Sequence, residues 1–163
     1  MSDEATGNFR KASSGFRWDG VERLNYKEEG AAPFKSISRQ TLFHTADLAG
    51  ELRYFEIEPG GFSTLERHAH MHAVMILRGR GRCLVGDDVR DVATLDLVAI
   101  PPWTWHQFRA GGQEKLGFLC LVDKERDRPR LPEAEDLARL RADPRVAAFL
   151  DGALDATRDE EGA

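Results

Sequence analysis

The sequence GGFSTLERHAHMHAVMILRGRG, residues 60–81, carries more information about this chain than any other stretch. Within seven positions it places Glu66, His68, His70 and His72, and apolar residues and a glycine-bracketed turn follow. Three of the five histidines of the chain lie here. A fourth, His106, follows a Pro-Pro turn later in the sequence. We expect the rest of the chain to form the scaffold that positions these polar residues.

The spacing of these residues predicts a metal site. Side chains alternate between the two faces of a β-strand, so Glu66, His68, His70 and His72 share one face if the strand is regular. Imidazole nitrogen and carboxylate oxygen are ligands of divalent transition metals. Burying several such groups together without a common partner is costly. The alternative is a set of core histidines that are satisfied by hydrogen bonds.

Length and composition predict one soluble globular domain of 163 residues, with 41% hydrophobic and 31% charged residues. A net charge of −5 argues against a nucleic-acid-binding surface. The N-terminal residues have no apolar core, and no later apolar run reaches about 18 residues, so we expect neither a signal peptide nor a membrane span. A cytoplasmic location follows, and in that compartment Cys83 and Cys120 are expected to be free thiols.

The order of short apolar runs and turn residues predicts an all-β fold, an antiparallel sandwich or barrel. Glycine, proline and aspartate clusters separate the runs. The expected strands are 36–43, 51–58, 62–67, 72–78, 81–85, 89–92, 97–100, 105–109 and 116–122.

The regions outside these strands divide into three segments. Residues 1–15 are expected to form a disordered tail. Residues 16–35 are expected to form an arm that packs on the body or on a partner subunit, because residues 16–26 contain three aromatic side chains among charges. Residues 124–163 are expected to form a helical extension, with helices starting at Pro132 and at Asp143-Pro144.

Two motifs resemble those of the cupin family. The pattern Gly60-x5-Glu66-x-His68-x3-His72-x6-Gly79 is similar to the first cupin motif, G-x5-H-x-H-x3,4-E-x6-G, with the first His and the Glu exchanged. The second cupin motif is G-x5-P-x-G-x2-H-x3-N, and residues 95–110 keep its Pro and His while losing both glycines and the Asn. The resemblance covers about residues 36–123.

This resemblance implies a double-stranded β-helix, or jelly-roll, barrel with the metal ligands Glu66, His68, His72 and His106. His70 is additional to the motif; it either replaces Glu66 as a ligand or acts as an acid or base beside the metal. Manganese is favoured, and iron, nickel and zinc also suit such a mixed nitrogen and oxygen site. Cupins are commonly dimers, so the resemblance also implies a homodimer.

Cys120 lies in LGFLCLVD, a late expected strand. In small cupins a similar strand crosses the metal cavity, so an inward thiol could reach the substrate. The alternative is a small core residue, since free cysteine is among the most buried residue types. Near a metal cation and histidines the pKa of the thiol is expected to fall.

The aromatic arm, LERHAHMHAVMILRGRG, PPWTWHQFRA and the C-terminal tail together resemble a small group of bacterial single-domain cupins. This group includes methylsulfurylases of 1-methylthio-xylulose 5-phosphate. The resemblance implies transfer of the methylthio group from that sugar phosphate to a thiol such as glutathione, leaving 1-deoxyxylulose 5-phosphate, on a route from methylthioadenosine salvage to isoprenoids. Cys120 would attack the sulfur, and His70 or Glu66 would protonate C1. The alternatives are a ferrous-iron oxygenase acting on a small organic or thiol substrate and a non-enzymatic metabolite-binding cupin.

Overall fold

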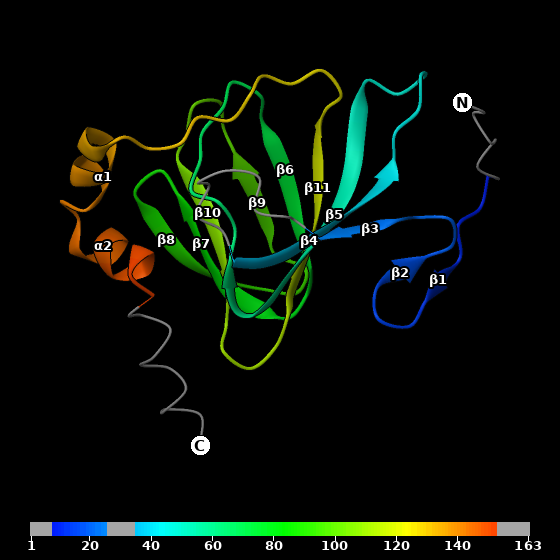
Figure 1. Cartoon of the computed structure of the whole chain (residues 1–163), viewed down its shortest axis with the longest axis horizontal. Coiled ribbons are helices and arrows are strands. Elements are labelled where there is room, and N and C mark those ends of the chain that lie inside the picture. Colours follow the sequence, from blue (N-terminus) through cyan, green and yellow to red (C-terminus); the bar gives the residue numbers. More distant parts are fainter. Residues whose placement is uncertain (1–7, 26–34, 153–163) are drawn as a thin grey trace.

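The computed structural model describes residues 8–25 and 35–152. The described residues are organised around one large antiparallel sheet, followed by two short helices (Figure 1). The strands are β1 Ala12–Ser13, β2 Arg17–Trp18, β3 Arg23–Asn25, β4 Lys35–Phe43, β5 Gly50–Phe62, β6 His72–Arg78, β7 Arg80–Val85, β8 Asp88–Ala93, β9 Leu97–Ile100, β10 His106–Ala110 and β11 Leu116–Asp123. The helices are α1 Ala134–Leu140 and α2 Pro144–Leu150.

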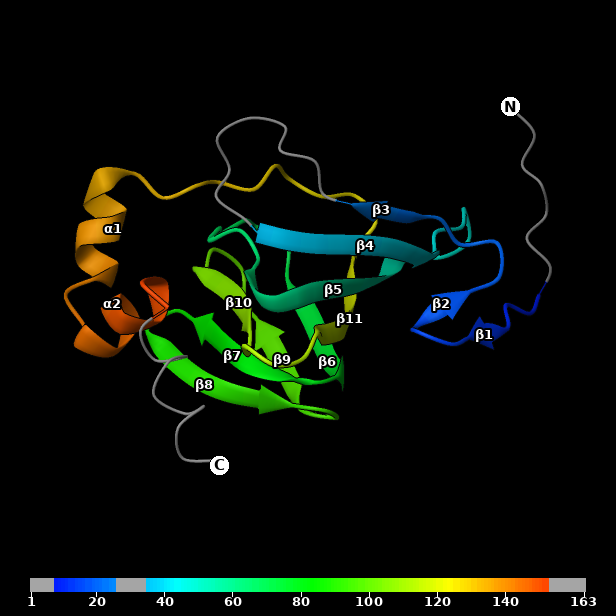
Figure 2. The same ribbon diagram turned by 60° about the horizontal axis from the view of Figure 1, so that its bottom comes forward.

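The sheet has nine strands in the order β8-β7-β10-β5-β11-β6-β9, and β4 and β3 add to it beside β5. The strand pairs within it are antiparallel. The sheet curls so that one face of each central strand turns inward, and Figure 2 shows β3 and β4 lying beside β5. The all-β prediction is confirmed, and eight of the nine expected strands correspond to β4–β11.

The expected strand at 62–67 is wrong. Strand β5 ends at Phe62, and β6 begins only at His72. Between them the backbone is irregular, apart from single bridges that pair Glu66 with His106 and Arg67 with Arg130. Backbone groups of this run bond to distant segments of the chain instead of to one neighbouring strand, and the run therefore forms a loop. The inference that four ligands share one strand face is therefore also wrong.

The described part of the N-terminal region packs on the outer face of the sheet. Phe16 stacks on Tyr54 with ring centroids 5.7 Å apart, and Trp18 meets the same ring edge-on at 5.3 Å. The guanidinium of Arg78 lies 5.0 Å from the centre of the Phe16 ring. These residues pack on the body, which is one of the two expected positions of the arm. Within the expected tail, Ala12–Ser13 form β1, which pairs with β2. Residues 1–7 and 26–34 lie outside the described residues.

The two helices cover β7 and β8 on one side of the sheet (Figure 1). Helix α1 begins two residues later than expected, at Ala134, because Glu133 is its N-cap. Helix α2 begins at Pro144 as expected, with the Asp143 side chain accepting from the backbone N–H of Arg145. Val146 and Phe149 of α2 are buried against Leu65 and Leu84. Residues 153–163 of the expected extension lie outside the described residues.

Candidate metal centre

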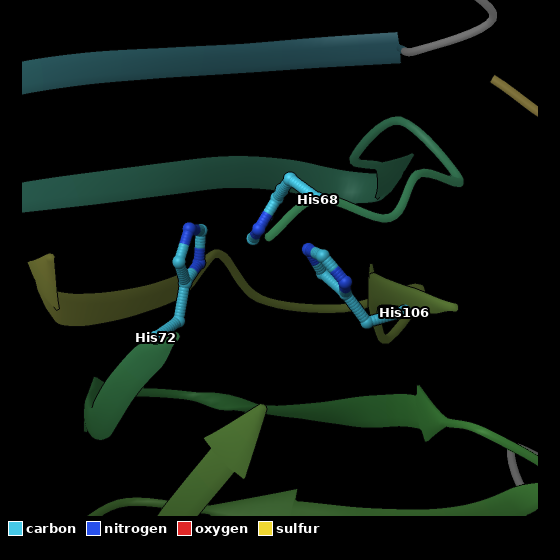
Figure 3. A group of neighbouring side chains, drawn as sticks. All are labelled: His68, His72 and His106. Carbon is cyan, nitrogen blue, oxygen red and sulfur yellow. The ribbon is translucent and has the colours of Figure 1, made fainter. Parts of the chain in front are cut away.

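Three imidazoles converge inside the curled sheet. His68 comes from the loop between β5 and β6, His72 is the first residue of β6, and His106 is the first residue of β10. One ring nitrogen of each lies within 4.8 Å of the others, and Figure 3 shows the three rings facing a common space. Within the described residues this is the one group of three or more potential ligands that fits a single metal ion. The predicted convergence of these residues holds, although it arises from a loop and two strand starts.

Backbone carbonyls orient two of the three rings. His68 Nδ1 lies 2.7 Å from the carbonyl oxygen of His70, and His106 Nδ1 lies 3.0 Å from that of Thr104. A carbonyl oxygen can only accept, so each Nδ1 carries the proton and each Nε2 keeps its lone pair. A hydrogen bond of this kind on the distal nitrogen is usual for a histidine that binds a metal. Both Nε2 atoms are therefore prepared to act as ligands.

The site has unsatisfied nitrogen atoms that a divalent ion would satisfy. The Nε2 atoms of His68 and His72 are buried and have no hydrogen-bond partner among the described residues. Burial lowers the pKa of His72 to about 2 and that of His106 to about 4, with neighbouring histidines adding to the shift at His72. The rings are therefore neutral at neutral pH, which is the form that binds a metal. The three residues fit a divalent transition-metal ion.

Glu66 lies at the edge of this cluster. Its Oε1 is 3.9 Å from His106 Nε2, and its backbone is paired with that of His106. Burial raises the pKa of the Glu66 carboxyl to about 7, and the Arg53 guanidinium opposes that shift. The carboxylate is outside the group of three imidazoles that fits one ion.

His70 is also outside the group of three imidazoles. Its ring is parallel to that of His68, with centroids 3.7 Å apart, and its centroid is 5.1 Å from that of His72. Its Nδ1 lies 2.7 Å from Oδ1 of Asp127, so this nitrogen donates to the carboxylate. The lone pair is then on Nε2, where it could accept a proton.

Asp127 is a site residue that the sequence did not reveal. One carboxylate accepts hydrogen bonds from the backbone N–H groups of Ala69 and His70, at 2.8 and 3.1 Å, and from the His70 ring. These contacts hold the loop whose His70 carbonyl orients His68. In the sequence Asp127 is one acid within a run of charges, and nothing in that run marks a partner 58 residues away.

Cys120 faces the interior from β11, with 1% of its surface exposed. Its directly opposed residues are Arg53 on β5 and Val74 on β6. Burial raises the pKa of the Cys120 thiol, and the guanidinium of Arg53 acts against that rise. The protein environment therefore shifts the pKa opposite to the expected fall. Cys83 is also buried, in the same apolar cluster, and burial raises its pKa as well.

Two further charged residues, Glu51 and Arg53, lie on the inner side of β5 near Cys120. Arg53 Nε is 3.7 Å from Glu51 Oε1, and the second oxygen of Glu51 is 2.8 Å from His44 Nδ1. Arg126, from the linker after β11, reaches Glu51 Oε1 at 3.4 Å. No motif in the sequence marks any of these residues.

Comparison with known proteins agrees with this geometry. The cupin domain family matches residues 53–122. A Rhodospirillum rubrum protein named 1-methylthio-D-xylulose 5-phosphate methylsulfurylase is 63% identical over 144 residues, which make up 88% of this chain and 92% of that protein. The chain belongs to the cupin family. The cupin resemblance and the double-stranded β-helix fold that it implied are thus confirmed.

Solved structures place this cupin among close relatives. A cupin-2 domain protein from Rhodospirillum rubrum is 62% identical with a TM-score of 0.82, over 88% of this chain and 97% of that one. A cupin 2 conserved barrel domain protein from Rhodopseudomonas palustris is 59% identical with a TM-score of 0.83, over 86% and 97% of the two chains. In the described residues, no helix is long and apolar enough to cross a membrane.

Proposed function

We propose that this cupin is a metal-dependent methylsulfurylase. It would transfer the methylthio group of 1-methylthio-xylulose 5-phosphate to a thiol such as glutathione and release 1-deoxyxylulose 5-phosphate, linking methylthioadenosine salvage to isoprenoid precursors. The observation that carries this proposal is 63% identity over nearly the full length of a protein with that name. The three-histidine cluster and a buried thiol supply suitable chemistry.

His68, His72 and His106 would hold the metal, with Glu66 as the fourth ligand. We favour manganese; iron, nickel and zinc are the other ions that this donor set suits. A bound divalent ion supplies a Lewis acid for the carbonyl next to C1 of the sugar. The protein residues keep the three imidazoles neutral and directed at one point.

Cys120 is the residue we propose for the attack on sulfur. Its thiol loses a proton, its Sγ bonds to the methylthio sulfur, and the C1–S bond breaks with its electron pair left on C1. C1 then takes up one proton, so the thiol is oxidised to a mixed disulfide and the carbon is reduced to a methyl group. Glutathione would release the enzyme by exchanging with the Cys120 disulfide. The inward position of Cys120 on β11 supports this assignment.

His70 is the residue we propose for proton transfer to C1. Its Nδ1–H is held by Asp127, so the opposite nitrogen is the one available to carry a proton. Its ring packs between the loop and the other imidazoles, 5.1 Å from His72 by centroid distance. Glu66 is the alternative proton donor, because its carboxyl has a raised pKa of about 7.

The test of the proposed function uses the purified, manganese-loaded protein with 1-methylthio-xylulose 5-phosphate and glutathione. We expect 1-deoxyxylulose 5-phosphate and methylthio-glutathione in equal amounts without oxygen uptake. Oxygen uptake with iron-loaded protein would instead indicate an oxygenase, and ligand binding without turnover would indicate a metabolite-binding cupin. Without glutathione, an intact mass should show one methylthio group on Cys120, and an unmodified thiol after product formation would exclude the covalent step.

We also propose that the protein is cytoplasmic, since a reducing compartment preserves free thiols and a thiol co-substrate.

We further propose that the protein is a homodimer. The support for a dimer is an apolar strip across the outer face of β9, β6, β11, β5 and β4. The strip exposes large side chains on neighbouring strands: Phe43, Met75, Leu97 and Leu121. A second copy of the same strip is its proposed partner. Sedimentation of the wild type and of Leu97→Glu tests this: a monomeric wild type would exclude the dimer.

A further inference from the structure

A buried arginine lies beside the thiol to which we assign the attack on sulfur. Only 6% of the surface of Arg53 is exposed, and its side chain lies on the inner face of β5. Its Nη2 is 4.0 Å from the sulfur of Cys120. Its Nε is buried and has no hydrogen-bond partner among the described residues. A cation that is buried to this extent needs a charged partner or a function.

The strand register gives Cys120 two unlike neighbours. Arg53 is directly opposite on β5, and Val74 is directly opposite on β6. The guanidinium is thus the polar group that lies against the sulfur across the sheet, while the other cross-strand contact is apolar. Directly opposed side chains of an antiparallel pair lie close together, so this pairing is fixed by the register of the fold.

The carboxylate of Glu51 contacts the guanidinium at Nε, while Nη2 is the atom nearest the sulfur. It lies two residues before Arg53 on the same inward face of β5, with 3.7 Å between its Oε1 and Arg53 Nε. Glu51 is shared, because Arg126 and His44 also contact it. One carboxylate divided among three partners leaves the guanidinium with donor capacity for a second anion.

We propose that Arg53, oriented by Glu51, is a positioning residue that stabilises the negative charge on the sulfur of Cys120. The proposal rests on the proposed function for the identity of the substrate, but not for the geometry of the two residues. As the thiol proton leaves, the guanidinium donates to the sulfur. As the Sγ–S bond forms and the leaving electron pair departs, that charge passes to the leaving group, so Arg53 assists the attack on sulfur.

Cys83 provides an internal comparison in the same molecule. It belongs to the same buried cluster as Cys120, and its thiol donates a hydrogen bond to the carbonyl of Leu84. On β10 its directly opposed residue is Phe108, and on β8 it is Arg90, which is exposed and paired with Asp88. The two thiols therefore differ chiefly in the buried guanidinium.

The test measures methylthiolation of each cysteine by methyl methanethiosulfonate, which gives cysteine–S–S–CH3 and methanesulfinate and needs no sugar phosphate. The protein is the full metal-free chain at neutral pH, and peptide masses report Cys120 and Cys83 separately. We expect Cys120 to react faster than Cys83. In Arg53→Met the rate at Cys120 should fall by about tenfold or more, as for loss of one hydrogen bond to a charged group.

The conservative variant separates this role from a structural one. Arg53→Lys keeps a cation beside the sulfur and should restore most of the Cys120 rate, while Cys83 stays unchanged in both variants. An unreactive Cys120 in the wild type, or an Arg53→Met rate equal to the wild-type rate, would overturn the proposal. If Arg53→Met raises the methylthiolation rates of both cysteines, the variant has opened the barrel. The Glu51→Gln variant is then the deciding test. A lower rate at Cys120 in that variant supports the proposal, and an unchanged rate overturns it.

The two proposals can fail separately. Arginine-dependent methylthiolation of Cys120 without turnover of 1-methylthio-xylulose 5-phosphate would exclude the substrate and keep the role of Arg53. Turnover of the sugar phosphate that is equally fast in Arg53→Met would exclude the role of Arg53 and keep the substrate.

Discussion

The interior of the barrel has two unlike ends, built from the same strands. At one end the inward side chains are apolar, and Phe118 stacks on Phe108 and Phe55 at centroid distances of 4.4 and 5.5 Å. Further along the same strands the inward side chains become polar or reactive. On β5 they are Arg53 and Glu51, on β6 and β10 they are histidines, and on β11 the residue is Cys120.

This difference separates stability from chemistry within one small domain. Aromatic packing at the apolar end holds the strands together without polar groups that need partners. The polar end contains buried nitrogens and a cation with unused hydrogen-bonding capacity, and such groups lower stability unless a ligand binds them. Changes at the apolar end should therefore alter folding, and changes at the polar end should alter metal binding and activity.

The largest effect is expected at the apolar end, for Phe118→Ala. Removing this ring leaves a cavity between Phe55 and Phe108, and the free energy of unfolding should fall by about 3–5 kcal/mol. Denaturant unfolding of metal-free wild type and variant measures this. The affinity of the folded variant for manganese should remain within a few-fold of the wild type. A loss of metal affinity larger than the loss of stability would show that the two ends are not separate.

The next effect is expected at the polar end, for His106→Ala. Loss of one of three imidazoles should lower manganese affinity and product formation by more than about a hundredfold, since even indirect partners of a ligand contribute 10–100-fold. Titration calorimetry and the turnover assay measure the two quantities. His44→Ala is the matched control for metal affinity, because this exposed imidazole is outside the metal cluster. Unchanged metal affinity in His106→Ala would contradict the assignment of the centre.

The sequence predicted the strands well because glycine and proline turns separate them. It predicted a strand at 62–67 where the structure has a loop, and the alternation of His68, His70 and His72 wrongly suggested a shared strand face. What shapes that loop is distant in the chain: the carbonyl of His68 accepts from the backbone N–H of Trp103 at 2.7 Å, and Asp127 holds the following residues. Contacts of such long range leave no local pattern.

The sequence also gave no indication that Glu51 and Arg53 are inside the barrel. In ELRYFEI the charged residues alternate with Leu52 and Tyr54, which suggests a strand whose polar side faces water. In the structure the inner face packs in the core, and on the outer face Phe16 and Trp18 cover Tyr54. Because the N-terminal arm covers the outer face at Tyr54, the apolar residue faces outward and the charged residues face the interior, opposite to what the alternation suggests.

A smaller effect on stability is expected for Gly117→Ala, on β11 beside Tyr54. A methyl group on Gly117 would lie 2.0 Å from the hydroxyl oxygen of Tyr54, which donates to Glu56. Overpacking of this kind should lower the free energy of unfolding by about 1–3 kcal/mol. Gly111→Ala is the control, since its nearest contact would be an ordinary 3.5 Å. Equal unfolding free energies in the two variants would show that Tyr54 moves aside freely.

The smallest effect is expected for Asp127→Asn, which tests whether the polar end depends on the linker outside the barrel. Asparagine keeps one oxygen but replaces the other acceptor with a donor, so one of the N–H groups at Ala69 and His70 loses its partner. The loop would then hold His68 less firmly, and manganese affinity should fall about tenfold. Glu125→Gln makes the same chemical change at an exposed acid of the linker and should leave the affinity unchanged. If Asp127→Asn also leaves it unchanged, the barrel alone positions the imidazoles, and the polar end is as self-contained as the apolar one.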